Sequence, residues 1–309
     1  MSSPLVIASS PHIRSDMSAQ KIMANVIGAL IPSGLAGAYF FGAEALAVMA
    51  VCTAACVAAE ALWQKISGAK VTVSDLSAAL TGLLLSYNLP PSIPLWMAAA
   101  GGVFSIIIVK QFFGGLGQNI VNPALAGRAM MLICWPVAMT TWTIHGMSGP
   151  TPLGVIKFSG KELPPLMDMA LGNIGGCIGE TSAAAILLGG VYLISRGIIS
   201  WRIPVIYIAV VAALTPLIGR PAGPVAELLS GGLMLGAFFM ATDYVTSPMT
   251  APGQAIFAVG CGVITSLIRA FGVYPEGVSY SILIMNLTVP LIDRLTPPRV
   301  LGESKKNAK

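Results

Sequence analysis

Long apolar segments separated by short polar loops run along the whole chain. Ten such segments are 15 to 21 residues long, and a helix needs about 20 apolar residues to cross the hydrocarbon core of a bilayer. Only 9% of the 309 residues are charged and 55% are hydrophobic, whereas a soluble domain carries about 25% charged residues. The chain is therefore predicted to be an all-α, polytopic membrane protein with about ten transmembrane helices. They lie approximately at 22–41, 43–63, 75–89, 93–110, 122–139, 180–195, 203–219, 225–242, 254–272 and 277–293.

Lysine and arginine are distributed unevenly over the loops. With the N-terminus in the cytoplasm, 12 of the 17 basic residues fall on the cytoplasmic side and three on the outer side, a bias that sets membrane orientation. Orientation therefore accounts for the net charge of +5, which gives no reason to expect a nucleic-acid partner. Both termini are predicted to be cytoplasmic, and the 40-residue loop at 140–179 is predicted to face outward.

The two halves of the chain share a pattern. Five segments precede the outer loop and five follow it, so any repeat that relates the halves must be inverted. "GGVFSIIIVK" (101–110) and "GCGVITSLIR" (260–269) both begin with glycine and end in a basic residue. A short or interrupted segment precedes each of them, at 75–92 and 225–248, and paired broken helices indicate a binding site near the midplane. A channel or solute transporter fits this pattern as well as a cofactor-holding scaffold does.

The pattern divides the chain into five parts. They are a cytoplasmic segment (1–21), a first five-helix repeat (22–139), the outer loop (140–179), a second five-helix repeat (180–293) and a cytoplasmic tail (294–309).

The outer loop contains a stretch of hydroxyl side chains, glycine and proline. In "SGPTPLG" (148–154), Gly149 permits close approach of another group, and the two prolines hold Thr151 in an extended conformation. A hydroxyl displayed in this way could accept a phosphoryl-linked group. Composition alone favours a rigid surface turn instead.

Several motifs along nearly the whole chain resemble one family of membrane subunits. "SGPTPLG" is similar to a flavin-attachment signature, Asp-x-x-Ser/Thr-Gly-Ala-Thr. The likeness extends to "SPHIRSDMSAQKIM" (10–23), "GGLGQNIVNPALAGRAMM" (114–131), "FFMATDYVTSPMTAPG" (238–253) and "GVYPEGVSYSILIMN" with "PLIDRLTPPRVLG" (272–302). The collinear set resembles the family that includes the D subunit of the Rnf complex (ferredoxin:NAD oxidoreductase) and the B subunit of the sodium-pumping NADH:quinone reductase.

The resemblance implies that Thr151 carries FMN as a phosphoester, with Ser148 and Gly149 at their expected offsets. Two positions depart from the signature, because His145 stands in place of its aspartate and Pro150 in place of its alanine. These departures keep open a third interpretation, a scaffold subunit without flavin.

The resemblance also implies a second, non-covalent flavin, riboflavin, in the membrane domain. Its expected contacts are Asn119, Asn122, Arg128, Asp243 and Thr246. Amide groups can hydrogen-bond to the edge of an isoalloxazine ring. The competing expectations are that Asn122 caps a helix and that Arg128 pairs with a carboxylate such as Asp75, since an unpaired cation is costly in a membrane.

The remaining charged side chains are expected near the membrane surfaces, because they lie close to the ends of the apolar segments. Lys110 and Arg269 are placed to snorkel, and Glu60, Glu180 and Glu227 are placed at the interface. The five cysteines form no CxxC pair and no Cys/His ligand spacing, so no metal site is expected.

As a whole, the resemblance implies a subunit of an ion-translocating oxidoreductase in a prokaryotic inner (cytoplasmic) membrane. Such a protein passes electrons through covalent FMN, coupled to Na⁺ or H⁺ transport. Its partners would be the other Rnf subunits (A, B, C, E and G), with the FMN-carrying G protein on the outer side as electron donor, and membrane lipid.

The charge distribution predicts the topology directly. Single cysteines at positions 157 and 161, in a background without the native cysteines, should react with an impermeant reagent from outside. Cysteines at positions 65 and 305 should react only after the cytoplasmic side is opened. Labelling of position 157 from the cytoplasmic side alone would contradict the ten-crossing arrangement.

Overall fold

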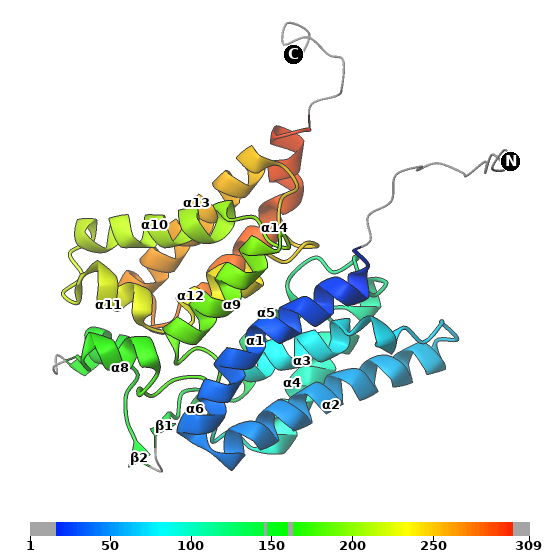
Figure 1. The fold of residues 1–309 in the computed structure, drawn as a ribbon, viewed down its shortest axis with the longest axis horizontal. Helices are drawn as coiled ribbons and strands as arrows, with labels where there is room; N and C mark the ends of the chain where they lie inside the picture. The colour runs from blue at the N-terminus through cyan, green and yellow to red at the C-terminus, as the bar shows by residue number, and fades with distance from the viewer. Residues whose placement is uncertain (1–16, 145–146, 160–162, 299–309) are drawn as a thin grey trace, which may run out of the picture.

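The computed structural model describes residues 17–144, 147–159 and 163–298, and helices dominate these residues (Figure 1). His145, most of the predicted N-terminal segment and most of the predicted C-terminal tail lie outside the described residues. The membrane helices of the first half are α1 (Ala19–Phe41), α2 (Ala43–Ile66), α3 (Ser77–Tyr87), α4 (Leu95–Ile107) and α5 (Pro123–Cys134). Those of the second half are α9 (Ala183–Ser195), α10 (Arg202–Leu217), α11 (Gly223–Leu229), α12 (Leu233–Leu235), α13 (Ala251–Phe271) and α14 (Val278–Leu295).

Short elements connect the membrane helices. Two 3₁₀ turns, η1 (Val73–Asp75) and η2 (Gln111–Phe113), lie in the first half, and a π-helical turn, η4 (Gly236–Met240), continues α12. Helix α6 (Pro136–Met139) follows α5 and precedes the predicted outer loop. The outer loop contains β1 (Thr143–Ile144), β2 (Met147–Ser148), α7 (Pro152–Gly154), the π-helical turn η3 (Val155–Ser159) and α8 (Leu166–Leu171).

Every predicted membrane segment contains a helix, but not every helix is long enough to span a bilayer. Among the described residues, five are long and apolar enough: α1, α2, α4 together with η2, α13 and α14. A sixth is obtained if α11 and the α12–η4 pair, which meet at a bend of 69°, count as one broken span. Large apolar side chains such as Leu35 and Leu291 are exposed on α1 and α14, as expected for surfaces that face lipid. The protein is therefore polytopic in the membrane.

The helices of the two halves pack in matching order. In the first half α2 packs against α3 and α4, and in the second half α10 packs against α11 and α13. The halves meet where α1 packs against α9 and α5 against α14. In Figure 1 the start of α1 and the end of α14 lie toward the upper end of the molecule, whereas α8 and the β1–β2 hairpin lie toward the lower end.

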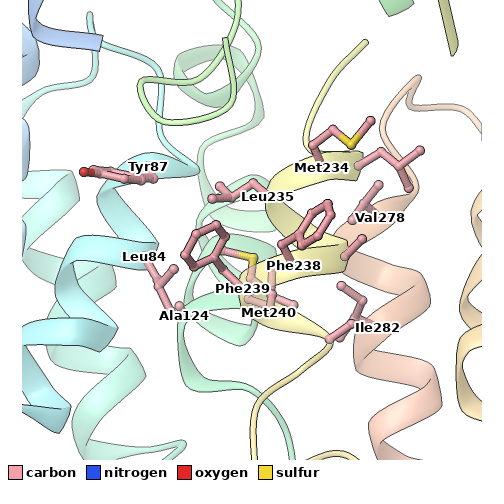
Figure 2. Packing of buried hydrophobic residues seen from close by; sticks show 14 of the residues in the cluster. Leu84, Tyr87, Ala124, Met234, Leu235, Phe238, Phe239, Met240, Val278 and Ile282 are labelled. Carbon is pink, nitrogen blue, oxygen red and sulfur yellow. The ribbon is translucent and has the colours of Figure 1, made fainter. Parts of the chain in front are cut away.

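The broken segment of the second half occupies the centre of the core. Figure 2 shows the side chains of α12 and η4 between Leu84 and Tyr87 of α3 on one side and Val278 and Ile282 of α14 on the other. The helix breaks because Gly231 adopts a φ of +63°, a conformation that costs glycine little and other residues more. The interrupted segment predicted at 225–248 is confirmed.

Arg269 satisfies the backbone at this break. Its guanidinium donates to the carbonyl of Glu227 at 2.7 Å and to that of Ser230 at 3.0 Å, which are carbonyls that the end of α11 leaves without helical partners. It also forms an ion pair with the Glu227 carboxylate at 3.0 Å, and both side chains are 2% exposed. The expectation that Arg269 snorkels is wrong, because its guanidinium is buried within the protein, and Glu227, expected near the interface, is buried with it.

Lys110 occupies the matching place in the first half. Its ammonium group donates to the Ser77 hydroxyl at 2.6 Å, at the start of α3, and to the Glu60 carboxylate at 2.8 Å. Lys110 and Glu60 are almost completely buried. The snorkelling position expected for Lys110 is therefore also wrong, and Glu60, expected near the interface, is buried with it. Both basic residues that the sequence aligned are buried and form an ion pair with a glutamate.

Replacement of Lys110 by methionine should strongly destabilise the fold. The change leaves the buried Glu60 carboxylate without its cation, and breaking a buried ion pair costs about 3–5 kcal/mol. Thermal unfolding in detergent would measure the loss, with Lys65→Met, on the exposed surface of α2, as the matched control. The double variant Lys110→Met/Glu60→Met should recover much of the stability. Equal melting of the Lys110→Met variant and the control would contradict a structural role for the pair.

Candidate functional site

Thr151 is the N-cap residue of the short helix α7 on the outer loop. Its backbone is extended, with φ −66° and ψ 158°, and its hydroxyl oxygen accepts a hydrogen bond from the Gly154 N–H at 3.1 Å. Pro152 favours both features, because it restricts the residue before it to extended conformations and suits the first position of a helix. The predicted extended conformation is confirmed. However, Thr151 is only 6% exposed, so a surface turn is the wrong description of this residue.

Thr151 lines a cavity of about 360 Å³ between the outer loop and the membrane helices, which lies within the range of small-molecule sites. The aromatic side chains of Trp142, Phe158 and Tyr274 line it, and Arg128 supplies a positive charge. Pro150 also lines this cavity, whereas Gly149 is exposed and has open space around it. Ser148 lies in strand β2, paired with Thr143.

Arg128 enters this cavity from α5 and joins the two halves of the protein. It forms an ion pair with Glu276 and donates to the Ser279 hydroxyl at 2.6 Å, both at the start of α14. The expected pairing with a carboxylate is therefore right, but Asp75 is the wrong partner. Asp75 instead accepts hydrogen bonds from the backbone and hydroxyl of Ser77, at 2.8 and 2.6 Å.

Lys157 fastens the outer loop to the end of α13. Its ammonium group donates to the carbonyls of Ile268, Gly272 and Tyr274, which compensates the negative end of that helix. Desolvation lowers the pKa of Lys157, and the nearby Arg220 adds to the effect. The contact keeps η3, which directly follows Thr151 and α7, against the second half of the protein.

A second cavity lies beside the start of α5. It has a volume of about 110 Å³ and is lined by Asn119, Asn122 and Asp243 among apolar side chains that include Phe238 and Phe239. Asn122 caps α5, because its side-chain oxygen accepts from the Ala124 and Leu125 N–H groups at 3.0 and 3.3 Å. Its side-chain amide also donates to the Met240 carbonyl at 3.3 Å. Asn122 therefore caps a helix and lines a cavity at once.

Asp243 and Thr246 form one polar network with Asn122. The Thr246 hydroxyl donates to Asp243 at 2.9 Å, and Asn286 of α14 links the Thr246 carbonyl, at 2.8 Å, to the Asn122 N–H, at 3.2 Å. Desolvation raises the pKa of Asp243, opposed by hydrogen bonds that include those from Thr246 and Asn119.

The structure thus brings together four of the five residues expected around riboflavin. Arg128 is the exception, because it lies beside Thr151, six residues farther along α5 than Asn122 and hence about 9 Å along the helix axis. Asn286 and Glu276 were not among the site residues predicted from the sequence. In the sequence, the only signal for Asn286 is that it is a polar residue inside an apolar segment. The only signal for Glu276 is that it is a carboxylate able to form an ion pair with Arg128.

Comparison with known proteins gives a consistent result. The model of the NQR2, RnfD, RnfE family matches residues 6–302. The chain is 50% identical to the D subunit of the Na(+)-translocating ferredoxin:NAD(+) oxidoreductase complex of Acetobacterium woodii, over 97% of this chain and 96% of that protein. It is 48% identical to the D subunit of the proton-translocating ferredoxin:NAD(+) oxidoreductase complex of Clostridium ljungdahlii, over 96% of each.

A more distant relative is the D subunit of the ion-translocating oxidoreductase complex of Stutzerimonas stutzeri, which is 38% identical over 94% of each chain. With a family match over nearly its whole length and relatives of this similarity, the chain belongs to the NQR2, RnfD, RnfE family.

Proposed function

We propose that this chain is the flavin-carrying membrane subunit of an ion-translocating ferredoxin:NAD⁺ oxidoreductase, an Rnf complex. The observation that carries the proposal is the position of Thr151, whose side chain lines a cavity suited to a flavin and containing Arg128. The names of the two most similar relatives described above support the same activity. They favour it over a channel or solute transporter.

The residues around Thr151 fit a covalently attached FMN. Aromatic side chains offer surfaces for the flat isoalloxazine ring, and the Arg128 guanidinium attracts the phosphate that would join the ring system to the Thr151 hydroxyl. Glu276 and Ser279 hold that guanidinium in place. When bound, the flavin supplies the electron-transfer chemistry, whereas the protein supplies position and charge.

The polar side chains around the second cavity suit a non-covalent riboflavin, but its volume of about 110 Å³ lies below the roughly 300–1,000 Å³ of small-molecule sites, so the cavity would have to widen to admit the ring. Asn119, Asn122 and Asp243 offer donors and acceptors to a polar ring edge, and the other lining side chains are mostly apolar but include the Lys110 ammonium group. Because the two cavities adjoin successive turns of α5, groups bound in them would be close neighbours across the membrane domain.

In the proposed complex the outer loop faces away from the cytoplasm and both termini lie inside, in the inner membrane. The other Rnf subunits are the partners, and the FMN-carrying G protein on the outer side would deliver electrons to the Thr151 side of the protein.

Replacement of Thr151 by alanine should abolish covalent flavin without preventing membrane insertion. The change removes one hydroxyl from the outer loop and alters no membrane helix. In-gel fluorescence of denatured protein, produced together with the flavin transferase, measures the attachment. Thr140→Ala is the matched control, because Thr140 lines the same cavity and its hydroxyl is engaged by the Pro136 carbonyl. Fluorescence that persists in the Thr151→Ala variant would show that another residue is the acceptor.

Replacements around the second cavity should lower the amount of riboflavin released by acid. Asn122→Ser keeps an oxygen able to cap α5 but removes the amide, and Asp243→Ala removes the carboxylate. Both should reduce riboflavin and leave the covalent FMN unchanged. Asn173→Ala, on the exposed outer loop, should change neither. Unaltered riboflavin in both cavity variants, or none in the parent protein, would refute this second site.

A further inference from the structure

A small chamber borders Thr151 and is distinct from the larger cavity around Arg128. Its volume is about 10 Å³, which accommodates about one water molecule or a dehydrated cation of similar size. Thr151, Glu180, Thr181 and Glu276 line it, together with backbone of glycine-rich segments. Thr151 and Glu276 line both spaces, so a charge in one is felt in the other.

Two polar atoms of this chamber lack hydrogen-bond partners among the described residues. They are Oε2 of Glu180 and the hydroxyl of Thr181, and these side chains belong to residues only 4% and 2% exposed. The other carboxylate oxygen of Glu180 accepts from the Cys177 N–H at 3.4 Å. A buried carboxylate oxygen without a partner is costly, so the arrangement indicates that a ligand completes it.

A glycine keeps space beside the unpaired oxygen. A Cβ atom at Gly232 would lie 2.3 Å from Oε2 of Glu180, a distance that no side chain tolerates. The break between α11 and α12 therefore also brings backbone, without a side chain, close to this carboxylate. Glu180, expected near the membrane interface, is buried within the protein.

The charges around the chamber do not balance. When both carboxylates are ionised, Glu180 and Glu276 contribute two negative charges and Arg128 contributes one positive charge, which leaves one negative charge in excess. One oxygen of each carboxylate and the Cys177 sulfur lie within 4.8 Å of one another. A single positive charge would neutralise this group, whereas a divalent cation would overcompensate it.

The available donors select the class of cation. Carboxylate and hydroxyl oxygens are hard ligands, which suit alkali and alkaline-earth ions better than soft transition metals. The thiol of Cys177 is engaged with the Asn88 carbonyl at 3.3 Å and so is not free to favour a soft metal. We propose that Glu180, Thr181 and Glu276 form a binding site for a monovalent cation of the size of Na⁺.

This inference rests on the proposed membership in an ion-translocating complex for its biological role, but it needs no bound flavin. Relatives named as sodium- and proton-translocating are 50% and 48% identical to the chain, so overall similarity does not select the ion. Substitution of the side chains that line the chamber can show which ion the protein binds.

The purified full-length chain in detergent tests the site. Thermal unfolding is measured in NaCl, in KCl and in choline chloride at constant ionic strength, and binding of ²²Na⁺ is measured by equilibrium dialysis. We expect a saturable rise of the melting temperature with Na⁺, a smaller rise with K⁺, and one Na⁺ bound per chain. A wild-type protein that neither binds ²²Na⁺ nor responds to it would overturn the proposal.

Four variants separate this site from general salt effects. Glu180→Gln and Thr181→Val should lose the Na⁺ response, whereas Thr181→Ser, which keeps the hydroxyl, should retain it. Glu44→Gln, an exposed carboxylate on α2, should behave as wild type. A Na⁺ response that survives Glu180→Gln refutes the assignment.

The flavin proposal and the cation-site proposal can be refuted independently of each other. Protein produced without the flavin transferase, and therefore without covalent flavin, should still bind Na⁺, because the assigned ligands need no bound flavin. Na⁺ binding by a protein that never acquires covalent flavin, even when the transferase is present, would support the cation site and refute the flavin role. Covalent flavin without Na⁺ binding would refute the cation site and support the flavin role.

Discussion

The arginine on α5 sets the arrangement of the outer half of this protein. A guanidinium inside a membrane domain needs anionic and hydrogen-bonding partners, and Arg128 finds them in Glu276 and Ser279 at the start of α14. This contact joins a helix of the first half to a helix of the second. It also places a fixed positive charge in the cavity that Thr151 lines. The same arginine thus joins the two halves and lines the cavity beside Thr151, together with its partner Glu276.

Interrupted helices create a second constraint of the same kind. Their free backbone groups must be satisfied within the protein because lipid offers no hydrogen bonds. Arg269 does this for α11, and Lys110 contacts the beginning of α3. The polar residues that remain near the breaks, such as Asn122 and Asp243, line the cavity beside η4, and π-helical turns such as η4 occur frequently at functional sites. Irregular backbone and candidate binding sites thus occur together for one physical reason.

Much of this architecture was predictable from sequence. Apolar run length located the helices and the interrupted segment at 225–248, and helix-start chemistry predicted the cap at Asn122. The burial of Thr151 and the partner of Arg128 were not predictable, because both depend on contacts between segments more than 100 residues apart. Burial of Glu60, Glu180 and Glu227 was missed for a related reason. Closeness to the end of an apolar run does not show whether a side chain is buried, and these three carboxylates are buried by contacts with segments far away in the sequence or in the adjacent loop.

The most direct measurement is mass spectrometry of the tryptic peptide Ala129–Lys157, which trypsin releases by cleavage after Arg128 and Lys157 and which contains Thr151. The peptide should come from the complex isolated from membranes of cells that contain the flavin transferase. The account predicts an added mass equal to FMN joined with loss of water, with fragment ions that locate it on Thr151. An unmodified peptide, or a flavin located on another residue, would contradict the central claim.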